Sequence, residues 1–146
     1  MTYLLDTNVI SELRKPERSA NADVRAWIRT RRPSELYLSA ITILELEVGV
    51  GRVERRDSAQ GKRLRTWLEE AVLGGFANRI LPFDLSAART AARFHVPDPR
   101  PERDAMIAAT ALEHQMTVVT RNTKDFAALG VLLVNPWEVA PASGGM

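Results

Sequence analysis

The chain has 146 residues, a length typical of a single domain with one hydrophobic core. It contains no cysteine, which excludes disulfide bonds, thiolate zinc sites and cysteine nucleophiles. Its formal charge is +2, it has no leader-like start, and no apolar run reaches the ~20 residues that a bilayer requires. We therefore expect a soluble, cytoplasmic protein with no membrane segment.

The first half of the chain predicts two strands, each followed by helices. Apolar runs set the strands, and spacings of three and four apolar residues set the helices. The elements expected here, in chain order, are a strand at 2–6, helices at 7–14 and 21–31, a strand at 36–40, and helices at 40–56 and 57–74. Gly74 and Gly75 are expected to end the last of these helices.

The second half predicts three more strands separated by helices. The elements expected are a strand at 79–83, helices at 85–95 and 101–115, a strand at 117–120, a helix at 123–129 and a strand at 131–134. Short apolar strands alternating with helices favour an α/β fold of three layers, α/β/α, around a central, mostly parallel twisted sheet of four to five strands. We assign residues 1–138 to one domain and expect a disordered tail at 139–146.

Acidic residues stand close to the ends of these predicted strands. Asp6 follows the buried run of the first strand directly, Asp125 comes soon after the strand at 117–120, and Asp104 opens a helix. A carboxylate beside the core needs a partner or a metal ion. Ligands of parallel α/β sheets bind beyond the carboxyl ends of the strands, so these acids could converge there.

Each acid also has a local structural explanation. Asp104 suits the first turn of a helix, and Asn122 could cap a helix in which Asp125 is the third residue. Asp84 is interpreted as a helix cap. Glu45 and Glu47 border apolar helix positions in the same way, so spacing alone does not choose between them.

Four motifs in order resemble those of a known family. DTNVISEL at 6–13, LSAITILELEVG at 38–49, RDAMIAATAL at 103–112 and VTRNTKDF at 119–126, with VNPWE at 134–138, look like the acidic motifs of PIN-domain ribonucleases of the VapC and FitB toxin type. The resemblance implies a PIN-like fold and selects four catalytic and metal-binding acids: Asp6, Glu45, Asp104 and Asp125. It also implies polar residues that support them: Asn8, Ser39, Thr42, Thr120 and Asn122. The segment PDPRPERD before Asp104 departs from the family in being stiffer and more basic.

Electrostatics gives such a cluster a meaning of its own. Carboxylates about 6 Å apart repel by roughly 3 kcal/mol per pair at an effective dielectric constant of 20. Cations, protonation or wider spacing must relieve this repulsion. Hard oxygen ligands select Mg²⁺ or Mn²⁺, and a chain with two histidines and no cysteine is unsuited to zinc.

The sequence therefore predicts a metal-dependent endoribonuclease. One or two Mg²⁺ or Mn²⁺ ions would activate water for in-line hydrolysis of an RNA phosphodiester, leaving 5′-phosphate and 3′-hydroxyl ends. Basic residues near the motifs are candidates for contact with RNA: Arg14, Lys15, Arg103, Arg121 and Lys124.

The resemblance further implies partners. Such toxins inhibit translation and growth, form homodimers, and are held inactive by a cognate antitoxin, a VapB-like DNA-binding protein. Operator DNA would be bound only through the antitoxin complex.

Two other classes of function compete with the nuclease interpretation. A haloacid-dehalogenase-type site would need Asp where Asn8 stands, and a receiver domain would need an acidic pair before its phosphorylated Asp. A catalytically silent PIN-like binding module, acting with a DNA-binding partner, stays open as the alternative.

Overall fold

A five-stranded parallel sheet forms the centre of the protein in the computed structural model, which describes residues 1–138. The strands are β1 (Tyr3–Leu5), β2 (Leu36–Ser39), β3 (Ile80–Leu81), β4 (Thr117–Val119) and β5 (Leu133–Val134). They lie in the order β3-β2-β1-β4-β5, and every pair is parallel. The predicted α/β fold is confirmed. The predicted tail at 139–146 lies outside the described residues, and the assignment of 1–138 to one domain stays a prediction.

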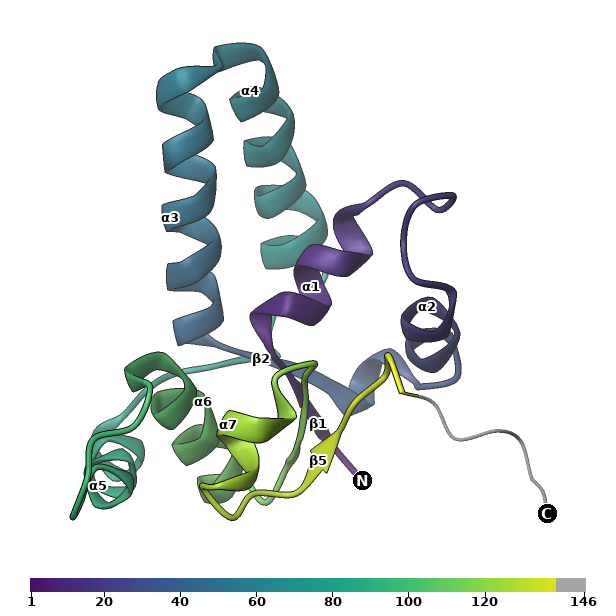
Figure 1. Cartoon of the computed structure of the whole chain (residues 1–146). Coiled ribbons are helices and arrows are strands. Elements are labelled where there is room, and N and C mark those ends of the chain that lie inside the picture. The colour runs from purple at the N-terminus through teal and green to yellow at the C-terminus, as the bar shows by residue number, and fades with distance from the viewer. Residues whose placement is uncertain (139–146) are drawn as a thin grey trace, which may run out of the picture.

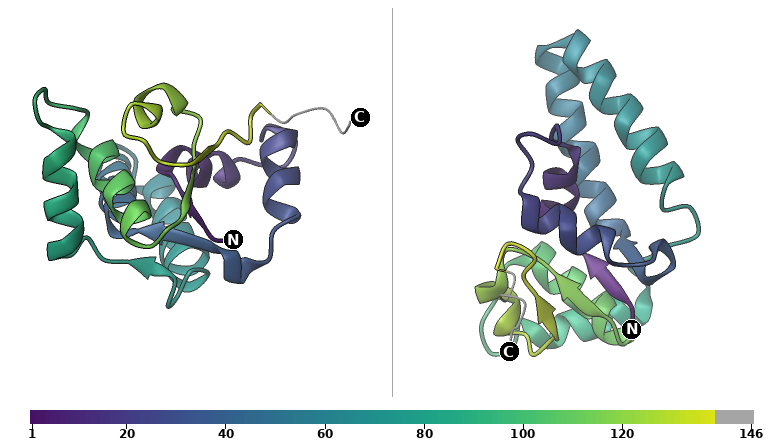
Figure 2. Two further views of the ribbon diagram at one scale, coloured as in Figure 1. Left: turned by 90° about the horizontal axis from the view of Figure 1, so that it is seen from below. Right: turned by 90° about the vertical axis from the view of Figure 1, so that its right-hand side faces the viewer.

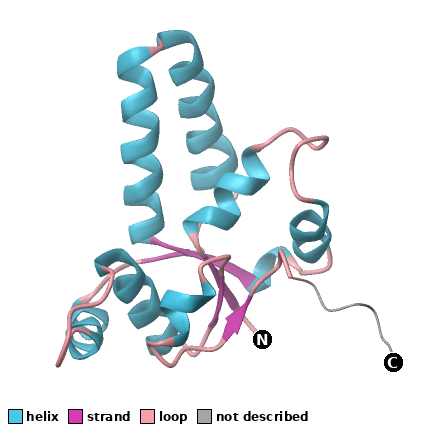
Figure 3. Cartoon of the chain, in the orientation of Figure 1, coloured by secondary structure: helices cyan, strands magenta, loops and turns pink. Residues whose placement is uncertain are grey.

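Helices cover both faces of this sheet (Figures 1 and 3). The α-helices are α1 (Thr7–Arg14), α2 (Ala22–Arg29), α3 (Ala40–Arg56), α4 (Ser58–Thr66), α5 (Leu85–Phe94), α6 (Glu102–Glu113) and α7 (Thr123–Ala127). A short 3₁₀ turn, η1 (Pro33–Glu35), precedes β2. Asp84 caps α5 as predicted, because its carboxylate accepts the Ala87 N–H at 2.9 Å. Among residues 1–138, no helix combines the length and apolar character needed to cross a membrane.

Two hydrophobic cores lie on opposite faces of the sheet. Successive strand residues point to opposite faces, so Tyr3 and Leu5 pack with α1, α2 and α3, whereas Leu4 packs with α6 and α7. All three β1 side chains are buried. The central strand is therefore apolar at every position, as a parallel sheet covered on both sides requires.

The helices α3 and α4 form a hairpin that projects from the body of the protein (Figures 1 and 2). Asp57 ends α3 and caps α4, accepting the Gln60 N–H at 3.1 Å. The helix expected at 57–74 changes its winding after Thr66 and continues as a π-helix, η2 (Trp67–Gly74). Gly61 lets the two helices approach, because a Cβ there would lie 2.6 Å from the Glu54 Cα.

The strand order reverses beside β1, which makes the β1–β4 boundary the switch point of the sheet. The chain runs outward from β1 to β2 and β3, and later returns to add β4 and β5 on the other side of β1. Ligand sites of parallel α/β sheets form at the carboxyl ends of the strands near such a point. Asp6 follows β1 there, and Thr120 follows β4.

Candidate active site

Asp6 links the sheet to the first helix and is almost wholly buried, with 5% of its surface exposed. Its backbone N–H donates to the Val119 carbonyl at 2.9 Å, and its Oδ1 caps α1 by accepting the Thr7 N–H at 2.8 Å. Its Oδ2 accepts the Thr120 hydroxyl at 2.7 Å. Burial raises the pKa of Asp6 and the charge of Glu45 adds to the rise, while the two hydrogen bonds oppose it.

Glu45 reaches the same site from α3. Ser39 starts this helix by accepting the Ile41 N–H at 3.0 Å, so Glu45 lies in its second turn. The Thr7 hydroxyl donates to Glu45 Oε1 at 2.5 Å, and Arg103 lies 3.7 Å from Oε2.

Glu47 points elsewhere and binds Arg65 of α4 at 2.7 Å. The structure thus places Glu45, and not Glu47, beside Asp6.

Asp104 and Asp125 are joined by one amide. Asn122 Nδ2 donates to Asp104 Oδ2 at 2.9 Å and to Asp125 Oδ2 at 3.0 Å. Asn122 precedes α7 as predicted, but its side chain makes no capping bond because it serves these two acids. Burial, and then the charges of the neighbouring acids, raise the pKa of Asp104 to about 6.

The acids surround a cavity of about 440 Å³ at the carboxyl edge of the sheet. Asp6, Glu45 and Asp104 line it, and Asp125 is linked to Asp104 through the Asn122 amide. The cavity is also lined by polar, basic and aromatic side chains: Thr7, Asn8, Ser11, Glu12, Lys15, Arg121, Asn122 and Trp137. Acids from four separate segments of the chain therefore meet at one site, as the motifs predicted for their positions.

The predicted supporting residues hold the acids in different ways. Asn8 donates to Asp6 Oδ2 and to Thr120 Oγ1, each at 3.3 Å, and Thr120 accepts the Asn122 N–H at 2.9 Å. Thr42 is fully buried, 3.2 Å from the Thr7 hydroxyl. Ser39 touches no acid and acts through its cap on α3.

The donor set suits a hard divalent cation. The cavity offers carboxylate and amide oxygens. The pKa of Asp104 is raised first by burial and then by the charges of Asp6, Asp125 and Glu45, which a bound cation would offset. Within residues 1–138, no three acidic, histidine or cysteine side chains stand close enough to enclose an ion. Mg²⁺ commonly keeps several waters and uses only one or two carboxylates, so Asp6 and Asp104 are the residues that would hold a hydrated ion in this cavity.

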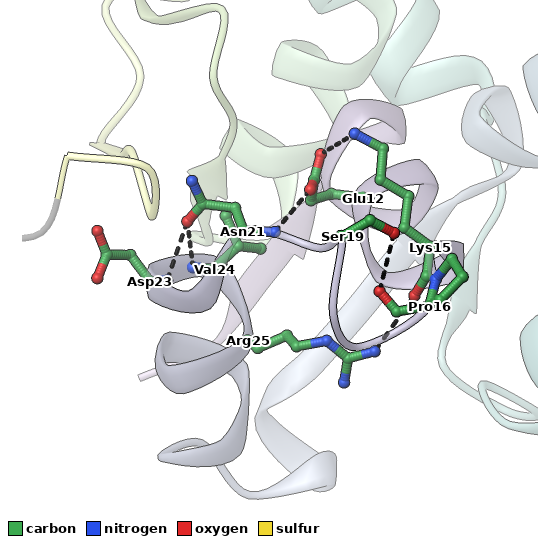
Figure 4. Close-up of polar contacts among 8 residues, drawn as sticks. All are labelled: Glu12, Lys15, Pro16, Ser19, Asn21, Asp23, Val24 and Arg25. Atoms are coloured by element: carbon green, nitrogen blue, oxygen red, sulfur yellow. Dashed lines mark hydrogen bonds and ion pairs between the residues drawn. The ribbon is translucent and has the colours of Figure 1, made fainter.

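Glu12 is a buried acid of this cavity that the sequence reasoning missed (Figure 4). Its Oε1 accepts the Lys15 ammonium at 2.9 Å, and its Oε2 accepts the Asn21 N–H at 2.8 Å. The bond from Lys15 is the main reason that the pKa of Glu12 is lowered. A signal was present in the sequence, since Glu12 stands three residues after Val9 on the buried face of α1 and three before Lys15.

The five basic candidates occupy different places. Lys15 and Arg121 line the cavity, and the Arg121 guanidinium lies 5.3 Å from the centre of the Trp137 ring. Arg103 is paired with Glu45. Arg14 lines a neighbouring cavity, whereas Lys124 is exposed on α7 and lines neither.

Comparison with known proteins gives consistent matches over nearly the whole chain. A family model described as the PIN domain matches residues 3–132. The chain is 42% identical over 145 residues to VapC ribonuclease Y4jK of Sinorhizobium fredii, covering 94% of this chain and 99% of the relative. It is also 42% identical over 144 residues to toxin FitB of Neisseria gonorrhoeae, covering 92% and 98%. A solved structure of FitAB bound to an IR36 DNA fragment aligns with a TM-score of 0.86 and 38% identity, covering 95% of this chain and 98% of the other.

Proposed function

The chain belongs to the PIN-domain family, beside VapC ribonuclease and FitB toxin relatives, and we propose that it is a Mg²⁺- or Mn²⁺-dependent endoribonuclease. The observation that carries this proposal is the meeting of Asp6, Glu45 and Asp104 around one cavity. Nothing about the local sequence of the three requires them to meet, and their mutual repulsion is costly unless the site serves a cation.

We assign the acids different roles. Asp6 and Asp104 would hold the cation, which when bound supplies positive charge opposite the phosphate and makes hydroxide available near neutral pH. Glu45, held by Thr7, would orient water beside them. Asp125 acts through Asn122 as a positioning residue for Asp104.

Basic side chains at the rim would offset the repulsion between these acids and RNA. Lys15 and Arg121 line the cavity, and a hydrogen bond to the Glu12 carboxylate holds the Lys15 ammonium in place. A polyanionic strand approaches such a site only when its rim is positive, so RNA binding should weaken steeply with salt.

We also propose the partners of a toxin. The aligned structure is that of FitAB bound to a DNA fragment, and by analogy this chain would be inhibited by a DNA-binding antitoxin. It would act as a homodimer, contact operator DNA only through that antitoxin, and cleave cytoplasmic RNA so that translation and growth stop.

The test is cleavage of total cellular RNA and synthetic RNAs by the purified chain in Mg²⁺, Mn²⁺ or EDTA. We expect cleavage only with a divalent ion, 5′-phosphate and 3′-hydroxyl ends, and a loss of about 100-fold or more in Asp6→Asn and Asp104→Asn.

Glu45→Gln is compared with Glu47→Gln, a matched control on the same helix that faces Arg65. Equal loss in both would remove Glu45 from the mechanism. Absence of cleavage of any RNA would favour the silent binding module.

A further inference from the structure

The end of the α3–α4 hairpin carries a concentrated net positive charge. We call its five basic side chains the basic tip; they are Arg52, Arg55, Arg56, Lys62 and Arg63, and all are exposed. Residues 52–63 contain these five and two acids, a net charge of +3 against +2 for the whole chain, so the other residues together carry −1. The end of the hairpin stands away from the body of the protein in Figure 1 and in the right-hand view of Figure 2.

The charge of the basic tip is not used within the folded chain. Arg65, the next arginine in the sequence, forms ion pairs with Glu47, Glu54 and Glu69. Glu54, one of the two acids within residues 52–63, is therefore already paired. The tip residues, by contrast, form no ion pair within residues 1–138. Favourable interaction with a helix C-terminus explains Arg55 and Arg56 in the last turn of α3 and Arg63 in the last turn of α4. It does not explain Arg52 or Lys62.

One face of α3 leads from the acidic cavity to this tip. Glu45, Gly49, Arg52 and Arg56 are spaced by four, three and four residues, which puts them on one side of a helix. A second cavity, of about 220 Å³, shares Glu45 with the acidic cavity and reaches Gly49, with Arg14 of α1 also in its lining. At 1.5 Å per residue, Arg56 lies about 16 Å along the helix from Glu45. This distance spans about five nucleotides of a strand that is stacked with the 3.4 Å rise of a duplex.

We propose that the basic tip binds the sugar–phosphate backbone of the substrate RNA about five nucleotides from the cleavage site. This inference rests on the proposed nuclease function and adds a second contact to it. Arginine favours bidentate contact with phosphate, and the face of α3 that carries Glu45, Gly49, Arg52 and Arg56 provides a path from the cavity to the tip. An RNA that occupies the cavity alone would be too short to reach the tip.

The test measures RNA binding in EDTA, where cleavage does not interfere. The anisotropy of fluorescein-labelled single-stranded RNAs of about 4 and about 20 nucleotides is followed at several salt concentrations. Loss of three phosphate contacts should reduce the magnitude of the slope of log K against log salt by about 2 for the longer RNA. The affinity of this RNA at low salt should fall at least tenfold. The shorter RNA should show no change in slope.

The tip variant is Arg52→Gln, Arg55→Gln, Arg56→Gln, and its matched control is Arg89→Gln, Arg93→Gln, Arg100→Gln. The control residues are also exposed, and removing them changes the net charge equally.

A second tip variant, Lys62→Gln with Arg63→Gln on the other helix, gives an independent reading if the first fails to fold by circular dichroism. The expected fall in its slope is about 1.4.

The outcomes separate this inference from the nuclease proposal. Equal slopes for the tip and control variants would overturn the inference, because only overall charge would then matter, and cleavage by the wild type would leave the nuclease proposal standing. A fall in slope confined to the tip variants, with no cleavage in Mg²⁺ or Mn²⁺, would support the inference and remove the nuclease. No binding of the longer RNA by the wild type would overturn the inference, and cleavage in Mg²⁺ or Mn²⁺ would still decide the nuclease proposal.

Discussion

Replacing Asp104 with asparagine should make the folded protein more stable at neutral pH while removing its activity. Burial and the charges of neighbouring carboxylates raise the pKa of Asp104 to about 6 from its ordinary 3.8. At 1.36 kcal/mol per pKa unit, this difference costs about 3 kcal/mol in the free energy of unfolding once the group is ionised. Screening by solvent at a partly exposed site reduces this to about 1–2 kcal/mol. Asparagine removes the charge and keeps an oxygen for the Asn122 amide.

The sign of the effect fixes its pH dependence. Since the folded protein binds the Asp104 proton more tightly than the unfolded chain, protonation stabilises the fold below about pH 4, and this stabilisation is lost as the pH rises through about 6. Asp104→Asn should therefore match the wild type near pH 4 and exceed it by about 1–2 kcal/mol at pH 7. The corresponding gain in Tm is about 4 °C for a chain of this size.

Urea unfolding and thermal melts at pH 4, 5.5 and 7 provide the measurement. Asp98→Asn, which removes an exposed acid from the loop before α6, is the control and should leave the curves unchanged. A variant that is less stable than the wild type at pH 7, or equally stabilised at pH 4 and pH 7, would refute the electrostatic reasoning.

Three further changes test other parts of the structure by urea unfolding. Thr120→Val should cost about 1–3 kcal/mol, because buried Asp6 loses its 2.7 Å hydrogen bond, and an unchanged midpoint would contradict that bond. Glu12→Gln should destabilise at pH 7 but converge with the wild type in acid. The pKa of Glu12 is lowered by folding, so its contribution is lost as the pH falls below 4.5, and a gap that persists at low pH would argue against this. Gly61→Ala should cost about 1–3 kcal/mol, whereas Gly49→Ala, with nothing within 4 Å, should gain about 0.5–1 kcal/mol; similar effects at both sites would exclude the close helix approach.

The fold could be predicted because its strands are short, apolar and separated by helices. The strand order could not be predicted, since the apolar residues of β1 have the same local sequence pattern whether β4 or β3 lies beside that strand. Pairing of residues 3–5 with 117–119 is decided by tertiary packing, which a local pattern does not contain. The π-helical winding of η2 had no sequence signal that we recognised.

The positions of the acids could be predicted only in part from local sequence. Asp6 is both a helix cap and a cavity acid, so its structural role does not exclude the proposed function. Only the family resemblance distinguished Glu45 from Glu47 in the sequence. The physical reason that Glu47 points away from the cavity is its ion pair with Arg65, which lies 18 residues later on the returning helix. Thr7 was missed, although it stands between two residues that the motif selected.

The pairing of β1 with β4 sets the time at which the acidic cavity can exist during synthesis. Asp6 leaves the ribosome first, yet its sheet partner Val119 and the last acid, Asp125, follow more than a hundred residues later. At 5–20 residues per second, the interval between Asp6 and Asp125 is about 6–24 s. A nascent chain that does not yet include Asp125 has no complete site. The ribosome and the message that produce the protein are therefore exposed to its active form only after nearly all of the chain has been made.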